Sequence, residues 1–287
     1  MDNPIGIHAS VWVGGWSEDE ARFAIEQSAA AGFDLIEIPA LEPAKIGIDT
    51  TRRALEAARL AAACSLGLGF DTDVSSDDPA VVARGERVLG DALSVVRDLG
   101  GRHLCGVLAS ALGRYTAPAT RRGRAHAAAA IRRLGEKAGQ AGITVSLEVV
   151  NRYESNLFNT AEEALAFIDE VSLPNVKVHL DTYHMNIEEA DLASPVRACG
   201  ERLGYVHIGA NNRGGLRQGA DGGMIDFPKL FRALREVGYR GPIGFESFSA
   251  AVVAEGLSSS LCIWRELWQD NVSLAREARA VIAGAMG

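Results

Sequence analysis

Eight short apolar runs, separated by segments with helical spacing, constrain the fold of this chain more than any other feature. The runs are rich in β-branched and other apolar residues, which suit buried strands. They cover residues 5–13, 33–39, 63–70, 103–109, 143–150, 176–181, 204–210 and 242–248. Because strand-like and helix-like segments alternate along the whole chain, each pair is expected to form one βα unit of a parallel sheet.

The segments between the runs carry signals for helix starts and helix ends. Asp226 is placed to cap the helical segment that precedes the last run. A glycine expected to end a helix in a left-handed conformation precedes four of the runs, at Gly32, Gly100, Gly142 and Gly204. The sequence therefore predicts one catalytic domain over residues 1–287, folded as a (β/α)₈ TIM barrel, with a doubly wound open sheet as the alternative.

Four acidic or imidazole side chains stand at or near the ends of the last four runs. They are Glu148, Asp181, His207 and Glu246. In a barrel the strand ends share one face, so these side chains should converge there, although each acid alone could be a helix cap or a loop residue. Three carboxylates buried together require a cation to offset their charge. The donor set suits Mn²⁺ best, with Co²⁺ or Mg²⁺ as alternatives.

Composition and charge exclude several classes of partner. The formal net charge of −8 opposes binding to nucleic acid, so a small neutral partner fits better. No apolar stretch approaches the roughly 20 residues of a membrane helix, and the N-terminus lacks the features of a secretory signal, which predicts a cytoplasmic protein without a membrane partner. The cysteines are far apart, which predicts buried thiols rather than disulfides or a zinc cluster, at Cys64, Cys105, Cys199 and Cys262.

The contexts of the four candidate ligands are long enough to indicate a family. The segments SLEVVNRYE, HLDTYHMN, YVHIG and FESF resemble those of the ketose 3-epimerases of the D-tagatose, D-allulose and L-ribulose group, within the xylose-isomerase-like barrels. The resemblance extends from GIHASVW near the start of the chain to IWRELWQDN near its end. It implies that the four candidate ligands bind one divalent metal ion and that the enzyme is a homodimer or homotetramer.

The resemblance also implies a reaction, the epimerisation of free ketoses at carbon 3. The pairs D-allulose and D-fructose, D-tagatose and D-sorbose, and L-ribulose and L-xylulose all fit the residues that match. The reaction removes a proton beside the carbonyl, forms an enediolate and returns a proton to the other face, so it needs two bases. Glu148 and Glu246 would be these bases, while the metal stabilises the developing charge. Glu154, His184 and Arg213 would bind the sugar hydroxyls.

The far end of the expected sugar site departs from the family pattern. His8 stands where many members have tyrosine, and ALGRY (111–115) stands where many members have aromatic residues after the fourth strand. We expect His8, Trp16 and Leu108 to contact the sugar there, whereas Trp12 suits the core equally well. His179, two residues before the metal-binding aspartate, is expected to pack or hydrogen-bond within the barrel.

Other functions use a similar barrel and remain alternatives. An aldose–ketose or hydroxypyruvate-type isomerase would move hydrogen between carbons 1 and 2. A sugar-phosphate epimerase would bind phosphate through Arg213 and Arg217, although the loop after the last run, SFSAAVV, is short of basic groups. A DNA-repair endonuclease of the related superfamily would need several zinc ions and many histidines, whereas this acidic chain has 6 histidines. A metal-stabilised barrel without activity would need no matched pair of glutamates.

Overall fold

The strands of the computed structural model, which describes residues 1–216 and 223–287, form a closed parallel barrel. Each strand pairs with the next one along the chain, and β8 pairs with β1. The strands are β1 (Ile5–His8), β2 (Leu35–Pro39), β3 (Ala61–Leu68), β4 (His103–Ala111), β5 (Thr144–Glu148), β6 (Val176–Asp181), β7 (Leu203–Ile208) and β8 (Ile243–Phe245). The predicted (β/α)₈ barrel is confirmed, and the open doubly wound sheet is excluded.

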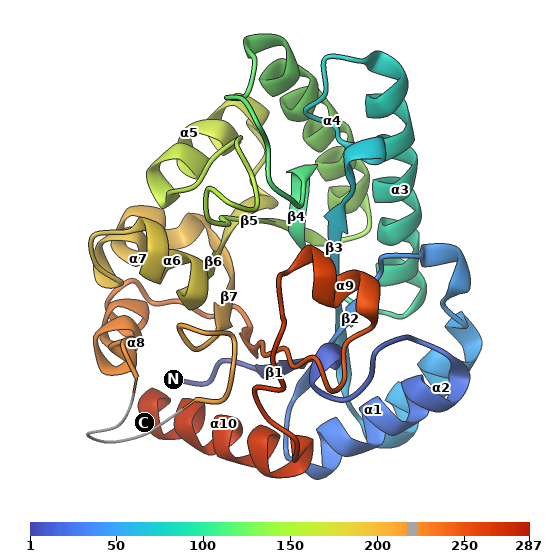
Figure 1. The fold of residues 1–287 in the computed structure, drawn as a ribbon, viewed down its shortest axis with the longest axis vertical. Helices are drawn as coiled ribbons and strands as arrows, with labels where there is room; N and C mark the ends of the chain where they lie inside the picture. Colours follow the sequence, from blue (N-terminus) through green and yellow to red (C-terminus); the bar gives the residue numbers. More distant parts are fainter. Residues whose placement is uncertain (217–222) are drawn as a thin grey trace.

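The helices form a ring around the strands (Figure 1). The α-helices are α1 (Glu18–Ala30), α2 (Ile48–Ala58), α3 (Pro79–Asp98), α4 (Arg121–Gln140), α5 (Ala161–Val171), α6 (Thr182–Glu188), α7 (Ala193–Cys199), α8 (Phe227–Glu236), α9 (Glu255–Ser260) and α10 (Asn271–Met286). Short 3₁₀ turns cover Ala9–Val11, Pro43–Lys45, Phe70–Thr72 and Gly200–Arg202. Because neighbouring strands all run parallel, their carboxyl ends open on one face of the barrel.

Local sequence signals explain most helix ends. The Asp226 side chain accepts a hydrogen bond from the Lys229 N–H, so it caps α8 as predicted. Left-handed backbone conformations occur at three of the predicted glycines, Gly32, Gly100 and Gly142. The prediction for Gly204 is wrong, because this residue lies inside β7, where a Cβ atom would come within 2.5 Å of Ser146 Oγ. Gly200, with φ of 52°, takes the left-handed position instead.

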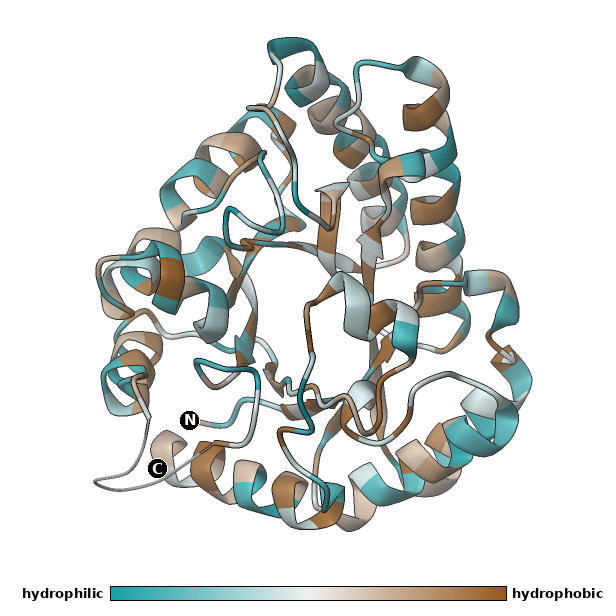
Figure 2. Cartoon of the chain, in the orientation of Figure 1, coloured by the Kyte–Doolittle hydropathy of each residue, from teal (hydrophilic) through white to brown (hydrophobic). Residues whose placement is uncertain are grey.

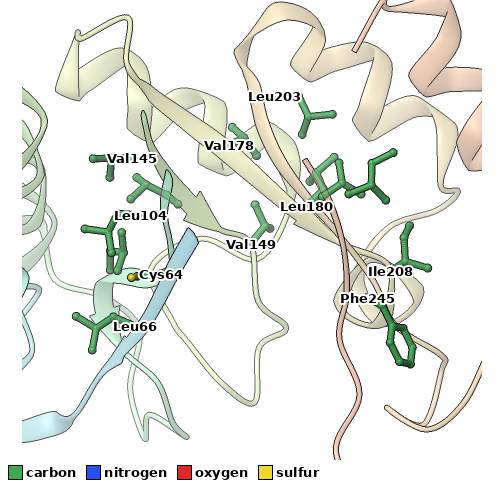
Figure 3. Close-up of a cluster of buried hydrophobic side chains, with 14 of the residues drawn as sticks. Cys64, Leu66, Leu104, Val145, Val149, Val178, Leu180, Leu203, Ile208 and Phe245 are labelled. Carbon is green, nitrogen blue, oxygen red and sulfur yellow. The ribbon is translucent and has the colours of Figure 1, made fainter. Parts of the chain in front are cut away.

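Apolar side chains fill two layers, one between the strands and the helices and one inside the barrel. The outer layer is continuous, and Figure 3 shows part of it, with side chains such as Leu104, Val178 and Phe245 projecting from different strands. Figure 2 shows hydrophobic and hydrophilic residues together on the ring helices, as expected for helices with one buried face. A smaller inner cluster contains Leu35, Ala63, Cys105 and Tyr205. The two layers hold the strand ends in fixed positions.

The prediction of buried thiols holds for most of the cysteines. Cys64, Cys105 and Cys199 are buried as predicted, but Cys262 is exposed because it follows α9 in a surface turn.

The two chain ends lie side by side, since the amino group of Met1 donates to the Met286 carbonyl at 3.0 Å (Figure 1). Within residues 1–216 and 223–287, no helix combines the length and the apolar character needed to cross a bilayer.

Candidate active site

The four candidate ligands lie together at the carboxyl ends of β5 to β8. Glu148 and Asp181 are the last residues of β5 and β6, His207 is the penultimate residue of β7, and Glu246 directly follows β8. The strand register aligns Asp181 with His207, and His207 with Gly244. The side chains of Asp181 and His207 are 0% and 1% exposed, and those of Glu148 and Glu246 are 10% and 11% exposed. Parallel register therefore gathers four polar groups in one buried place.

The distances within this cluster fit a bound cation. His207 Nδ1 lies 3.9 Å from Glu148 Oε1, 3.9 Å from Asp181 Oδ2 and 3.6 Å from Glu246 Oε1. These separations are too long for hydrogen bonds, but an ion with bonds of about 2.0–2.2 Å spans atoms up to about 4.4 Å apart. Neither His207 Nδ1 nor Asp181 Oδ2 has a hydrogen-bond partner among the described residues. The residues present therefore fit a divalent metal ion.

The pKa values of the three carboxylates in this cluster are shifted in different directions. Burial, together with the nearby charges of Asp181 and Glu148, raises the pKa of Glu246 well above its usual value. Burial also raises the pKa of Asp181. Burial acts the same way on Glu148, but His179 and His207 outweigh it and lower the pKa of Glu148 to about 2. Burial therefore opposes the ionised forms of Asp181 and Glu246, and the positive charge of a divalent ion would favour them.

Glu37 supports His207 from inside the barrel, a role that the sequence analysis missed. Its side chain is fully buried, and its Oε2 lies 2.8 Å from His207 Nε2. Burial alone would raise the pKa of Glu37, but the charge and hydrogen bond of His207 lower it below its usual value. This contact leaves Nδ1 of His207 free to face the other carboxylates, the arrangement typical of metal-binding histidines. In the sequence, the signal for this role is an acidic residue inside the apolar run LIEIP.

His8 lies beside Glu37 and lines the cavity into which the candidate metal ligands face, so its contact with the sugar stays a prediction. Its Nδ1 is 2.5 Å from Ser10 Oγ, its Nε2 is 3.2 Å from Ser65 Oγ, and the same Nε2 is 3.7 Å from Glu37 Oε1. Burial lowers the pKa of His8, although the charge of Glu37 opposes this effect. The first three strands therefore contribute a connected polar network to one wall of the cavity.

The three residues predicted to bind the sugar hydroxyls meet in a second buried group. Arg213 Nη2 lies 2.9 Å from Glu154 Oε2 and 3.1 Å from His184 Nε2. Its guanidinium carbon is 4.2 Å from the centre of the Tyr183 ring, a cation–π contact. Burial would raise the pKa of Glu154, but the charge and the hydrogen bond of Arg213 lower it. Arg213 lies in a loop rich in glycine and asparagine, yet it is not a surface arginine, because it is only 4% exposed.

The backbone at Arg213 is held in an unusual conformation. Its φ of 59° places a non-glycine residue in the left-handed region, which requires support from surrounding contacts. The Arg213 carbonyl accepts hydrogen bonds from the Phe248 N–H at 2.9 Å and from Ser247 Oγ at 2.8 Å. These bonds tie the loop after β7 to the loop after β8, so the guanidinium is fixed relative to Glu246.

A cavity connects both groups of residues. His8, Glu37, Glu148, His184 and Arg213 line it together with Glu154, His207 and Glu246. Its remaining wall is largely apolar and includes Leu41, Leu66, Val107, Leu112, Leu257 and Leu261. In Figure 1, α9, which contains Leu257, lies over the barrel. The site is thus a cavity with a polar end at β5 to β8, a polar network from β1 to β3 and an apolar wall over the rest.

Two of the predicted sugar contacts do not line this cavity. Trp16 lines a neighbouring pocket, and its Nε1 donates to Thr51 Oγ1 at 3.2 Å. Leu108 is fully buried in the layer between strands and helices, because Val107 occupies the inward position of β4 and strand neighbours face opposite sides. Trp12 also belongs to this core.

The structure also places His179, while Arg217 lies outside the described residues. The His179 ring is fully buried, and its centre is 4.3 Å from the centre of the His207 ring. Neither of its ring nitrogens has a hydrogen-bond partner in the part of the chain that the structure describes. His179 packs within the barrel, as expected, and does not line the cavity.

Comparison with known proteins identifies the family. The sequence profile of the xylose isomerase-like TIM barrel family matches residues 25–278. The chain is 52% identical over 273 residues to an L-ribulose 3-epimerase from Methylomonas sp. (strain DH-1), covering 95% of this chain and 94% of that protein. The chain belongs to the ketose 3-epimerases of the xylose isomerase-like TIM barrel family. It is therefore an enzyme of the isomerase class.

Two further relatives of this ketose 3-epimerase agree in sequence and in structure. A ketose 3-epimerase from Arthrobacter globiformis is 48% identical over 278 residues, which cover 97% of this chain and 95% of that protein. The crystal structure of a D-allulose 3-epimerase from Methylomonas sp. in complex with D-allulose superimposes with a TM-score of 0.96 at 50% identity, covering 99% of this chain and 97% of that chain. The nuclease and non-catalytic alternatives are thereby excluded.

Proposed function

We propose that this enzyme interconverts free ketoses that differ at carbon 3, in a metal-dependent reaction carried out by residues 1–287 as one catalytic domain. The observation that carries this proposal is the pair of glutamates, Glu148 and Glu246, on either flank of His207. Glu148 Oε1 and Glu246 Oε1 lie 3.9 and 3.6 Å from the same nitrogen, His207 Nδ1, and come from β5 and β8. Two carboxylates at the ends of a four-strand arc can reach a substrate carbon between them from two sides.

Glu148, Asp181, His207 and Glu246 would hold the metal ion. Three oxygen donors and one imidazole favour Mn²⁺, with Co²⁺ or Mg²⁺ as alternatives. Such an ion, when bound, acidifies the C–H bond beside a carbonyl and stabilises the negative charge that develops on oxygen. Glu37 would keep His207 in the orientation and tautomer that a metal ligand requires.

The protein side chains account for the proton transfers. One glutamate would take the proton from carbon 3 while the other returns a proton to the opposite face, and the reverse reaction would exchange their roles. Arg213 and His184 would donate hydrogen bonds to the sugar oxygens and to the enediolate, and Glu154 would accept from a hydroxyl. Since these groups are buried, water is largely excluded from the intermediate.

The cavity favours an uncharged sugar over a sugar phosphate. Among the described residues that line it, Arg213 is the one Lys or Arg side chain, and its charge is balanced by Glu154. The apolar wall suits the carbon chain of a ketose. The relatives support D-allulose with D-fructose and L-ribulose with L-xylulose as substrate pairs, and D-tagatose with D-sorbose fits the same groups. We further propose a cytoplasmic homodimer or homotetramer.

The test is to incubate metal-stripped enzyme with D-fructose in D₂O, with and without added Mn²⁺. The proposal predicts D-allulose only with Mn²⁺, carrying deuterium at carbon 3 by NMR. An aldose with deuterium at carbon 2 would instead establish the aldose–ketose isomerase reaction. Parallel incubations with L-ribulose and D-tagatose ensure that a narrow sugar preference is not mistaken for inactivity.

A further inference from the structure

Asn151, in the loop after β5, lies directly against the His184 ring. The asparagine is 1% exposed. Its backbone nitrogen is 3.1 Å from His184 Nδ1, and its side-chain Nδ2 is 2.9 Å from the same atom. Two nitrogens of one residue thus converge on a single ring nitrogen of a residue that faces the cavity.

The hydrogen bonds of the Asn151 amide fix which end faces the ring. Its Oδ1 accepts a hydrogen bond from the Tyr153 backbone N–H at 2.9 Å, and its Nδ2 donates to Glu154 Oε1 at 3.1 Å. A backbone N–H only donates and an ionised carboxylate only accepts, so a flipped amide would oppose like groups at both contacts. The group that faces His184 is therefore the NH₂ donor.

These contacts determine the tautomer of the histidine. The Asn151 backbone N–H and its NH₂ group both donate, so His184 Nδ1 must supply the lone pair, and the proton of the neutral ring sits on Nε2. The other tautomer would set one N–H of the ring against two donors at once. We propose that Asn151 is a positioning residue that fixes His184 as the Nε2–H tautomer.

The fixed tautomer makes one contact in the cavity unfavourable until substrate is present. His184 Nε2 lies 3.1 Å from Arg213 Nη2, and both groups are then donors that cannot satisfy each other. Arg213 Nε and Nη1 also have no hydrogen-bond partner within residues 1–216 and 223–287. Arg213 Nη2 already donates to Glu154 Oε2, and His184 Nε2 lies 3.7 Å from Glu148 Oε1, too far for a hydrogen bond. His184 Nε2 and the other two Arg213 nitrogens therefore need an acceptor, which an oxygen of the ketose or its enediolate provides. This step rests on the proposed function: His184 serves as a neutral N–H donor to substrate and not as a base.

The tautomer can be measured without any assay of activity. The probe is the full-length enzyme with ¹⁵N-labelled histidine and diamagnetic Mg²⁺, and a His184→Gln variant identifies the resonances of this ring. The ¹⁵N chemical shifts separate a protonated ring nitrogen from one with a lone pair. We expect Nε2 to be protonated and Nδ1 to be unprotonated. A protonated Nδ1 in the wild-type enzyme would overturn the proposal, whatever reaction the enzyme catalyses.

Variants at Asn151 separate a positioning role from a merely structural one. Asn151→Asp presents an acceptor to Nδ1, so the proton should move towards Nδ1, and kcat should fall by about 10- to 100-fold while KM changes less than about threefold. Asn151→Ala keeps the backbone donor and should show a smaller change in the same direction. Tyr153→Phe keeps the backbone N–H that orients the amide, and is the control with unchanged shifts. Wild-type shifts and kcat in both Asn151 variants, with thermal unfolding confirming their fold, would overturn the assignment.

Discussion

The two halves of the barrel share one architecture but present different chemistry at their strand ends. The ends of β5 to β8 carry three carboxylates and an imidazole, and each carboxylate has an oxygen 3.6–3.9 Å from His207 Nδ1. The ends of β2 to β4 present a wall that includes Leu41, Leu66 and Val107. Since both halves are built from the same βα unit, the fold supplies positions, and the residues at the strand ends decide what those positions do.

The halves are nevertheless connected through the barrel interior. Glu37 belongs to β2, yet its hydrogen bond goes to His207 on β7 at 2.8 Å. Its other oxygen lies 3.7 Å from His8, which belongs to β1. The half formed by β1 to β4 therefore also supports the metal-binding half, through contacts inside the barrel. Substitutions in each half test how far the division of roles between the two halves holds.

The largest effect is expected at the two glutamates of the β5 to β8 half. Glu246→Gln and Glu148→Gln each keep the shape of the side chain but remove a base, so kcat should fall by about 10²–10⁴-fold, the range typical of general acid–base catalysis. Retained metal binding, measured by calorimetry, would separate loss of the base from loss of the ion. The surface variant Glu56→Gln is the control, and wild-type kcat in Glu246→Gln would contradict the two-base mechanism.

Removing the partner of Arg213 should destabilise the same half. Glu154→Gln leaves a buried guanidinium without its counter-ion, which costs about 3–5 kcal/mol in typical buried pairs. Because the folded-state pKa of Glu154 is lowered, its stabilising contribution is present above the unfolded pKa of about 4.3 and is lost as the pH falls through the folded value.

Urea unfolding at a series of pH values measures this effect. The difference between wild type and Glu154→Gln should be greatest near pH 7 and shrink in acid. The exposed pair of Asp169 and Arg202 provides the control, since Asp169→Asn should cost less than about 1 kcal/mol. A difference that does not change with pH would show that the ion pair is not the cause.

A smaller effect is expected from the support that crosses between the halves. Glu37→Gln keeps a hydrogen-bond acceptor near His207 but removes the negative charge, so metal affinity should fall by about 10- to 100-fold. Calorimetric titration with Mn²⁺ measures the affinity directly, and saturating metal should restore most of kcat. Unchanged affinity would mean that the β2 strand merely packs against the site.

The smallest effect is expected at Trp16, which lies outside the cavity. Trp16→Phe removes the hydrogen bond to Thr51, worth about 1 kcal/mol of stability, and leaves the cavity wall intact. The KM for D-fructose or L-ribulose should stay within about twofold of the wild-type value. A tenfold rise in KM would show that Trp16 does contribute to the sugar site and that the loop after β1 takes part in sugar binding.

Much of the fold and the polar end of the site could be predicted from the sequence because both depend on short patterns. Apolar runs and helix caps mark the strands and helices, and the acids at the strand ends meet wherever parallel strands end together. The side of a strand that a residue faces is harder to predict. Which side of the barrel Leu108 faces depends on irregularities in β4. Gly106 of that strand has φ of 109°, and the register between β3 and β4 shifts between Gly67 and Leu68.

The residues that sequence analysis missed act through contacts between distant segments. Glu37 reaches His207 across 170 positions of the chain, and Asn151 reaches His184 across 33. An acid within an apolar run indicates only that a buried partner exists, without naming it. Gly204 was misassigned for a related reason, because the space that requires a glycine there is filled by Ser146 of β5, two strands away in the barrel.

A crystal structure of the Mn²⁺-loaded enzyme, with anomalous scattering to locate the ion, tests the central claim most directly. The account predicts one strong peak within bonding distance of Glu148, Asp181, His207 Nδ1 and Glu246. His8, Glu37 and Glu246 form another group of donors close enough to hold an ion. A peak at that group, with His207 remote from the ion, would contradict the division between a reactive half and a supporting half.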